Sequence, residues 1–174
     1  MAAADPRPLT GEPVVLDLLN TRWTVDGTPL DLFAGAAGLT RVEGVAVWLE
    51  SAGLADRFRA DAPALVHLLT AREALARAVA DPADASARAL LDAVLEHGRV
   101  RITLTPEGPG ERAEFADPAW GPAWTAVRAY LDLLGSAPGR IRTCASDDCG
   151  LRFHDTSPDG IRRRCGTAAC GDRA

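Results

Sequence analysis

Four cysteines lie in the last 31 residues of this 174-residue chain: Cys144, Cys149, Cys165 and Cys170. Each pair has the spacing C-x4-C, and 15 residues separate the two pairs. A segment this short cannot bury enough apolar surface to fold alone, so it needs a cross-link. Four thiolates around one Zn²⁺ would supply it, and so would two disulfides in a secreted chain. Because the N-terminus does not resemble a signal peptide, we favour zinc, with disulfides and free thiols as the alternatives.

A zinc ion with four cysteine ligands has no open position for water or substrate, so this site would be structural rather than catalytic. The remaining residues carry no catalytic motif: His67 and His97 lie in predicted helical regions, and His154 has only its neighbour Asp155. All 19 basic residues are arginine, which excludes Schiff-base and phosphate-loop lysine chemistry. We therefore expect a protein that is not an enzyme and that holds one structural Zn²⁺.

Charge is distributed unevenly along the chain, whose formal net charge is −5. Residues 1–139 carry 12 Arg against 19 acidic residues, a net of −7, whereas residues 140–174 carry 7 Arg against 5, a net of +2. The acidic total excludes non-specific coating of nucleic acid. The arginines near the cysteines could still bind phosphate or read guanine edges. These candidate nucleic-acid contacts are Arg162, Arg163, Arg164 and Arg173.

A second interpretation of the same arginines stays open. They could pair with Asp155, Asp159 and Asp172 and keep a small segment in solution. Four thiolates plus one Zn²⁺ contribute −2, which cancels the +2 of the segment. The charges alone therefore do not decide between DNA and another partner.

Hydrophobic periodicity predicts an α+β protein, mainly helical in its N-terminal part. Helices are expected near residues 14–21, 40–53, 61–81, 84–98 and 117–135. Thr40 with Glu43 forms a capping box, Asp61 opens the helix at 61–81, and Asp84 can cap the helix at 84–98. The run at 14–21 is too short to separate helix from strand, and helix is favoured. Within it, Asp17 and Asn20 would contact a ligand or, as we prefer, hydrogen-bond a buried turn.

Two shorter regions lack the helical period. Residues 22–30 contain the breakers Asp26-Gly27 and Thr28-Pro29 and are expected to be a turn-rich stretch. Apolar and polar residues alternate over 99–105, which predicts a half-buried strand returning near 112–115 in a hairpin that spans about 99–116. Residues 136–139 resemble a linker, so the predicted domains are 1–137 and 138–174.

The cysteine segment resembles a CGNR-type zinc finger. The likeness rests on residues 144–157, CASDDCGLRFHDTS, and on residues 162–173, RRRCGTAACGDR, where Cys-Gly-Asp-Arg replaces Cys-Gly-Asn-Arg. The run LDLLNT at residues 16–21 resembles the start of the ABATE domain, which usually precedes this finger. The resemblance implies a treble clef, with the first cysteine pair in a knuckle, the third cysteine at a strand end and the fourth in the first turn of a helix.

The resemblance also implies a stress-induced transcription regulator. In that interpretation the finger binds double-stranded DNA, and the N-terminal domain senses a signal or interacts. The alternative is a zinc-stabilised module that binds a protein or a small molecule without DNA and responds to oxidation through its zinc thiolates. A homo-oligomer or another protein partner would then be expected. No apolar run approaches the length of a membrane span, so we expect a cytoplasmic protein with no membrane partner.

Overall fold

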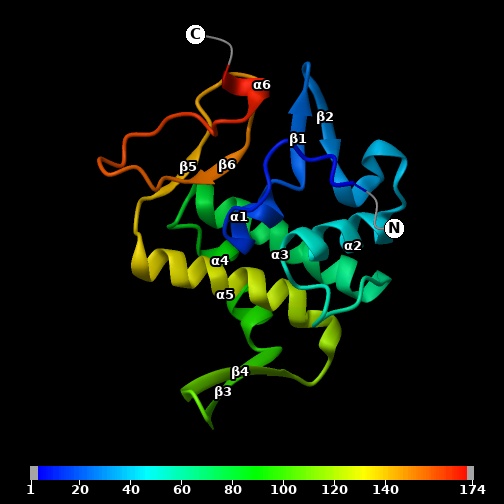
Figure 1. Ribbon diagram of the computed structural model, residues 1–174, viewed down its shortest axis with the longest axis vertical. Helices are drawn as coiled ribbons and strands as arrows, with labels where there is room; N and C mark the ends of the chain where they lie inside the picture. The colour runs from blue at the N-terminus through cyan, green and yellow to red at the C-terminus, as the bar shows by residue number, and fades with distance from the viewer. Residues whose placement is uncertain (1–3, 172–174) are drawn as a thin grey trace.

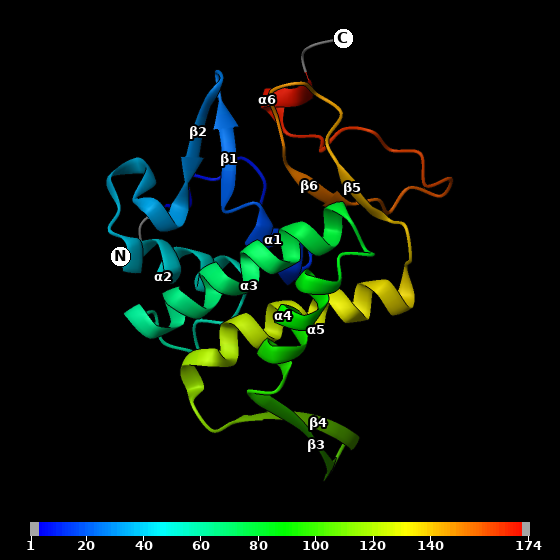
Figure 2. The same ribbon diagram turned by 180° about the vertical axis from the view of Figure 1, so that it is seen from behind.

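A short buried helix, α1 (Val14–Leu19), lies at the centre of the protein, and it confirms helix rather than strand for this run. The computed structural model describes residues 4–171, which Figures 1 and 2 show from opposite sides. Around α1 the described residues form an α+β fold in which the longer helices pack together and three two-stranded antiparallel sheets lie at the periphery. No helix among the described residues is both long and apolar enough to cross a membrane.

Four longer helices surround α1: α2 (Arg41–Ser51), α3 (Ala62–Ala80), α4 (Ala85–Leu95) and α5 (Gly121–Ser136). Their predicted N-terminal caps are confirmed: Thr40 and Glu43 make both hydrogen bonds of a capping box, and Asp61 and Asp84 cap α3 and α4. Such a cap contributes about 0.5–2 kcal/mol. α5 begins later than expected because Pro118–Trp120 forms a separate 3-10 turn, η3.

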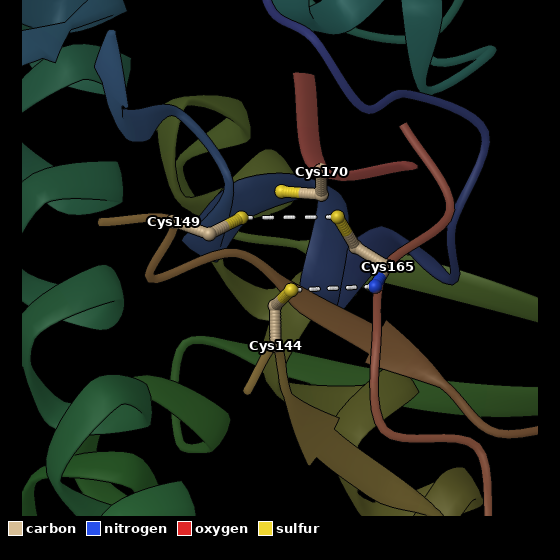
Figure 3. A group of neighbouring side chains, drawn as sticks. All are labelled: Cys144, Cys149, Cys165 and Cys170. Carbon is tan, nitrogen blue, oxygen red and sulfur yellow. Dashed lines mark hydrogen bonds between the residues drawn. The ribbon is translucent and has the colours of Figure 1, made fainter. Parts of the chain in front are cut away.

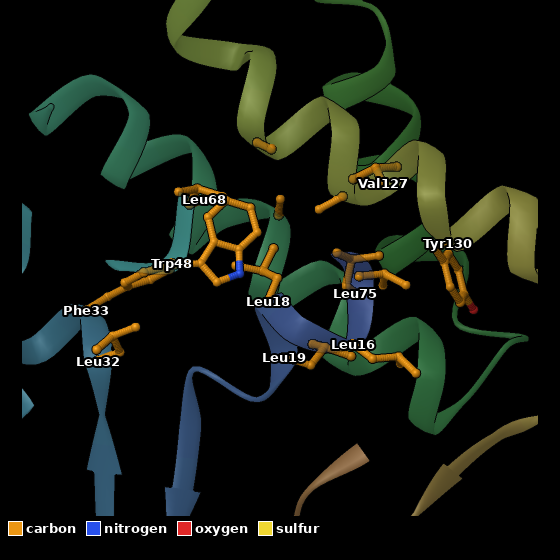
Figure 4. Packing of buried hydrophobic residues seen from close by; sticks show 14 of the residues in the cluster. Leu16, Leu18, Leu19, Leu32, Phe33, Trp48, Leu68, Leu75, Val127 and Tyr130 are labelled. Carbon is orange, nitrogen blue, oxygen red and sulfur yellow. The ribbon is translucent and has the colours of Figure 1, made fainter. Parts of the chain in front are cut away.

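The core lies where α1, α2, α3 and α5 meet (Figure 4). Trp48 of α2 is fully buried and packs edge-on against Phe33, with ring centroids 6.4 Å apart. Phe33 belongs to the 3-10 helix η1 (Leu32–Ala34). A second 3-10 helix, η2 (Ala36–Gly38), follows η1. At the other end of the core, the Tyr130 hydroxyl donates to the carbonyl of Ala78 at 3.1 Å, which ties α5 to α3.

The region expected to be a turn at 22–30 is in fact a hairpin of β1 (Arg22–Val25) and β2 (Thr28–Asp31). Asp26 and Gly27 form its two-residue loop, with φ of 48° and 76°. Positive φ at both loop positions is the geometry that Asp-Gly favours between two strands. Asp26-Gly27 was therefore recognised correctly as a turn, whereas Thr28-Pro29, also expected to break regular structure, begins strand β2. The strands on either side of the loop were missed.

The second hairpin, β3 (Gly98–Thr105) with β4 (Gly108–Phe115), confirms the predicted strand and its return. The expectation that it is half-buried is wrong for its outer half. Ile102 and Leu104 are 68% and 88% exposed because the hairpin extends beyond the helices at one end of the molecule (Figure 1).

At the opposite end, the C-terminal segment forms β5 (Ile141–Thr143), β6 (Arg152–His154) and the four-residue helix α6 (Ala168–Gly171). β5 pairs with β6, and β6 contacts α1. Figure 2 shows this segment beside the β1–β2 hairpin.

Candidate metal centre

The four cysteines come from two loops and one short helix of the C-terminal segment. Cys144 and Cys149 lie in the connection between β5 and β6, Cys165 lies in the loop after β6, and Cys170 lies in α6. The first pair therefore sits in a knuckle and the fourth cysteine in a short helix, as the resemblance implied. Cys165 is not at a strand end, because residues 161–167 form no strand.

The four Sγ atoms converge on one point (Figure 3). They all lie within 4.8 Å of one another, and those of Cys149 and Cys165 are 3.7 Å apart. A tetrahedral zinc site with Zn–S bonds of about 2.3 Å places its sulfurs about 3.8 Å from each other. All four side chains are buried, and none forms a disulfide. The residues thus fit one Zn²⁺ with no open coordination position.

The pKa values of the thiols show why this cluster calls for a cation. Burial and neighbouring thiols raise the pKa of Cys149 far above its ordinary value, and burial also raises that of Cys165. Burial acts on Cys144 in the same direction, but the N–H groups of Ser146 and Cys165 outweigh it and lower the pKa of Cys144 to about 6. Four thiols this close cannot all ionise together unless a cation compensates them, and Zn²⁺ supplies that charge.

Asp155 organises the loop that carries Cys165. Its side chain is fully buried and accepts hydrogen bonds from the Ser157 N–H at 3.0 Å and the Arg162 N–H at 3.1 Å. The hydrogen bond from the Ser157 hydroxyl holds the pKa of this carboxyl below its ordinary value. The loop between β6 and the third cysteine is therefore fixed by an ionised aspartate that lies outside the metal cluster.

The candidate DNA contacts fall into different environments. Arg162 donates to the carbonyls of Arg164 and Cys165 and lies 4.5 Å from the centre of the Phe153 ring, so its guanidinium holds the metal loop. Arg163 and Arg164 are exposed on this loop. Arg173 lies outside the described residues. The sequence grouped these arginines by position; the structure shows the Arg162 guanidinium bonded to carbonyls of the loop, and Arg163 and Arg164 exposed on it.

Two side chains of the N-terminal part hold the finger in place, and both were missed in this role. The side-chain amide of Asn20 donates to the Arg152 carbonyl and accepts from the Arg152 N–H, each at 2.8 Å. A Glu12 carboxylate oxygen accepts from the N–H of His154, also at 2.8 Å. Asn20 therefore hydrogen-bonds backbone, as preferred from the sequence, but its partner is the part-buried first residue of strand β6, 132 residues further along the chain, and not a buried turn.

Asp17, the other polar residue of this run, faces the interior of the N-terminal part. Arg7 donates to Asp17 Oδ2 at 3.1 Å and the Ser51 hydroxyl donates at 3.2 Å. Burial nevertheless raises the pKa of Asp17 above its ordinary value. These hydrogen bonds of the Asp17 carboxylate lie within the N-terminal part.

A surface cavity of about 400 Å³ lies between the β1–β2 hairpin and the cysteine knuckle. Its lining combines residues 24–27 of the hairpin with residues 145–149 of the knuckle. Pro8, Leu151, Arg164, Thr167 and Cys170 complete it. The hairpin side of this cavity could have been found from the sequence, because Asp-Gly between alternating residues signals a hairpin.

Fold and site together define a protein with a helical N-terminal part and a structural zinc finger. Residues 12–137 match the ABATE family, described as "Putative stress-induced transcription regulator", and residues 140–174 match the CGNR zinc finger. The chain belongs to the ABATE family. The CGNR match and the four buried cysteines identify the cofactor as one structural Zn²⁺. No curated protein matches the chain.

Proposed function

We propose that this protein is a DNA-binding transcription regulator, with a zinc finger at residues 138–174 for output and a domain at residues 1–137 that senses or interacts. The observation that carries the proposal is the fixed attachment of the two parts through Asn20 and Arg152. A change in the N-terminal domain that moves α1 would be transmitted to β6 through these two hydrogen bonds. A cytoplasmic location is proposed as well.

The metal is proposed to be held by Cys144, Cys149, Cys165 and Cys170. All four are at most 7% exposed, so the ion would be screened from water. When bound, the zinc neutralises two of four thiolate charges and fixes the loops that carry the exposed arginines. It provides no catalytic position.

The proposed DNA contacts are Arg163 and Arg164, with Arg173 near the C-terminus. Arg162 supports them indirectly, because its guanidinium fixes the carbonyls of Arg164 and Cys165. Arg140 and Arg142 act in the same way: they donate to Ser157 and Gly160 carbonyls at 2.7 and 2.9 Å. Three arginines of the finger thus order the loop, and in this proposal the exposed ones would contact phosphate or a base edge.

A second function is favoured by the cavity between the β1–β2 hairpin and the knuckle. At about 400 Å³ it is large enough for a small molecule. In this alternative the chain binds a small molecule or a protein partner without DNA, and oxidation of the thiolates lining the cavity releases the metal. The hairpin loop would then be part of the binding site.

A selection experiment separates the two functions. The zinc-loaded chain is mixed with a pool of random duplexes, and bound duplexes are recovered over several rounds with bulk DNA as competitor. The proposal predicts enrichment of a shared sequence. Enrichment of none, together with a partner that co-purifies after nuclease treatment, would favour the second function.

A further inference from the structure

The β3–β4 hairpin leaves a row of apolar side chains in solvent. Ile102 and Leu104 are 68% and 88% exposed, and they share one face of β3 with Val100 because alternate side chains point the same way. Figures 1 and 2 both place the hairpin at one end of the molecule, outside the helices. Among the described residues, β3 pairs with β4 and with no other strand. An isolated pair of strands is marginally stable, and a bare strand edge is a template for another strand.

The free edge of β3 exposes the backbone groups of the same apolar residues. The hydroxyls of Thr103 and Thr105 donate to the carbonyls of Gly110 and Gly108, at 3.3 and 3.0 Å, so these two carbonyls point toward β3. Hydrogen-bonded and non-hydrogen-bonded pairs alternate along an antiparallel ladder. The N–H and C=O groups of Val100, Ile102 and Leu104 therefore point away from β4, toward the open edge.

We propose that this edge is a dimer interface, in which β3 of one copy pairs antiparallel with β3 of a second copy about a twofold axis at Ile102. In this register Ile102 faces Ile102 of the other copy, and Val100 faces Leu104. The outward N–H and C=O groups of Val100, Ile102 and Leu104 then donate to and accept from those of the second copy. The two apolar rows join on one face of a four-stranded sheet.

The charges of the hairpin suit a second copy of the same chain. Residues 98–115 carry three arginines and three glutamates, namely Arg99, Arg101, Arg112, Glu107, Glu111 and Glu114. The hairpin therefore has no net charge, and two hairpins do not repel each other. In the proposed register Arg101 faces Thr103 and Arg99 faces Thr105, so no like charges are directly opposite. Within one copy, Arg99 already pairs with Glu114 at 2.9 Å.

The other edge of the hairpin is unsuited to the same pairing. At Pro109 the backbone nitrogen faces the open edge of β4 but carries no hydrogen. This edge therefore lacks one of the donors that a second strand would need. A twofold axis at Glu111 would also place two glutamates opposite each other. Strand pairing therefore favours β3.

Sedimentation velocity of the zinc-loaded full chain, at increasing concentration and without DNA, tests the interface. We expect the 18.3 kDa monomer to convert to a species of twice that mass. Ile102→Lys places two like charges opposite each other and should raise the dimer dissociation constant at least about tenfold. Ile161→Lys is the matched control, because Ile161 is 72% exposed, in the finger, and should leave the dimer unchanged.

The register has its own test. Ile102→Lys and Ile102→Glu should each remain monomeric, and their mixture should form a heterodimer because Lys then faces Glu. A chain that stays monomeric at all concentrations, a dimer insensitive to Ile102→Lys, or variants that fail to associate when mixed would overturn the proposal. Since no DNA is present, these outcomes are independent of the selection experiment.

Discussion

The side-chain amide of Asn20 makes two hydrogen bonds of 2.8 Å with the backbone of Arg152, one to the carbonyl and one from the N–H. Asn20 is 1% exposed at the end of α1, and Arg152 begins β6 of the zinc finger. An amide satisfies a backbone donor and acceptor at the same time, which neither a carboxylate nor a hydroxyl can do in this geometry. The contact therefore joins the ABATE part and the finger at one residue.

Replacing Asn20 by Ala should destabilise the protein by about 1–3 kcal/mol, because the part-buried N–H and C=O groups of Arg152 then lose their partner. Asn20→Asp keeps the acceptor and places a second acceptor against the Arg152 carbonyl, so it should also be destabilising. Urea unfolding followed by circular dichroism measures both changes. If Asn20→Ala unfolds at the same urea concentration as the wild type, the contact does not hold the finger.

The Arg72–Asp31 pair should make stability depend on acid pH. Arg72 is 2% exposed and donates to both carboxylate oxygens of Asp31, at 2.8 and 2.7 Å. Burial raises the pKa of Asp31, but the hydrogen bonds from Arg72 and Arg22 outweigh it and lower the pKa below its ordinary value. On acidification, the Asp31 carboxylate therefore binds a proton at higher pH in the unfolded chain than in the folded protein. The stabilisation is present above about pH 4 and is lost as pH falls through the lowered pKa of the folded protein.

Asp31→Asn tests that dependence. It leaves the Arg72 guanidinium buried without its counter-charge, which should cost about 3–5 kcal/mol at neutral pH. The difference from the wild type should shrink as pH falls below about 4, where the Asp31 carboxylate of the unfolded chain begins to bind a proton, and it should disappear once pH is below the lowered pKa of the folded protein. Thermal unfolding from pH 2 to 7 measures it, and a constant difference across that range would contradict the assignment.

His67 should produce a second, milder pH effect. Its ring stacks on Trp120 with centroids 3.6 Å apart, and His97 stacks on the opposite face of the same indole at 3.7 Å. Burial lowers the pKa of His67, His97 lowers it further, and Asp117 and Asp61 act in the opposite direction. Because the unfolded chain binds this proton more readily, stability should decrease as pH falls below about 6.5. His67→Gln should flatten the pH profile of unfolding between pH 5 and 7, whereas an unchanged profile would exclude His67 as its source.

Removing zinc should unfold the finger before the helices. A chelator removes the ion whose positive charge stabilises four neighbouring thiolates. Without it, β5, β6 and α6 should lose their fixed arrangement. The helical core from α1 to α5 has its own buried contacts and should keep most of its helical signal. Native mass spectrometry should find one zinc per chain, and proteolysis after chelation should cut within residues 140–171. Protection of that segment without metal would contradict a zinc-dependent finger.

The sequence predicted those features that depend on neighbouring residues. The caps at Thr40, Asp61 and Asp84 use bonds to N–H groups three residues away, so the local pattern was sufficient. The cysteine cluster was predicted because its repeated spacing leaves few chemical alternatives. The β3–β4 hairpin was predicted from alternation, but alternation shows only that one face is apolar. Whether that face is covered depends on packing elsewhere, and Leu104 is exposed.

Features that depend on distant residues were not predicted. Nothing around Asn20 indicates that its partner lies 132 residues later, since one amide side chain fits many buried turns. The same limit applies to Arg162: an arginine beside a zinc ligand suggests a phosphate contact, yet its guanidinium bonds the Arg164 carbonyl at 2.9 Å. The β1–β2 hairpin is different, because Asp26-Gly27 carried a local signal for strands on both sides.

The central claim, that the zinc finger binds DNA through its exposed arginines, is tested most directly by fluorescence anisotropy with a selected duplex at increasing salt. For the zinc-loaded wild type, the logarithm of the binding constant should fall linearly with the logarithm of salt concentration. The double variant Arg163→Ala and Arg164→Ala should bind more weakly and reduce that slope by about 2, about 0.9 for each lost phosphate contact. Arg59→Ala removes the same kind of charge from the loop between α2 and α3 and should change neither value. Equal affinity and equal slope in the wild type and the double variant would contradict the account.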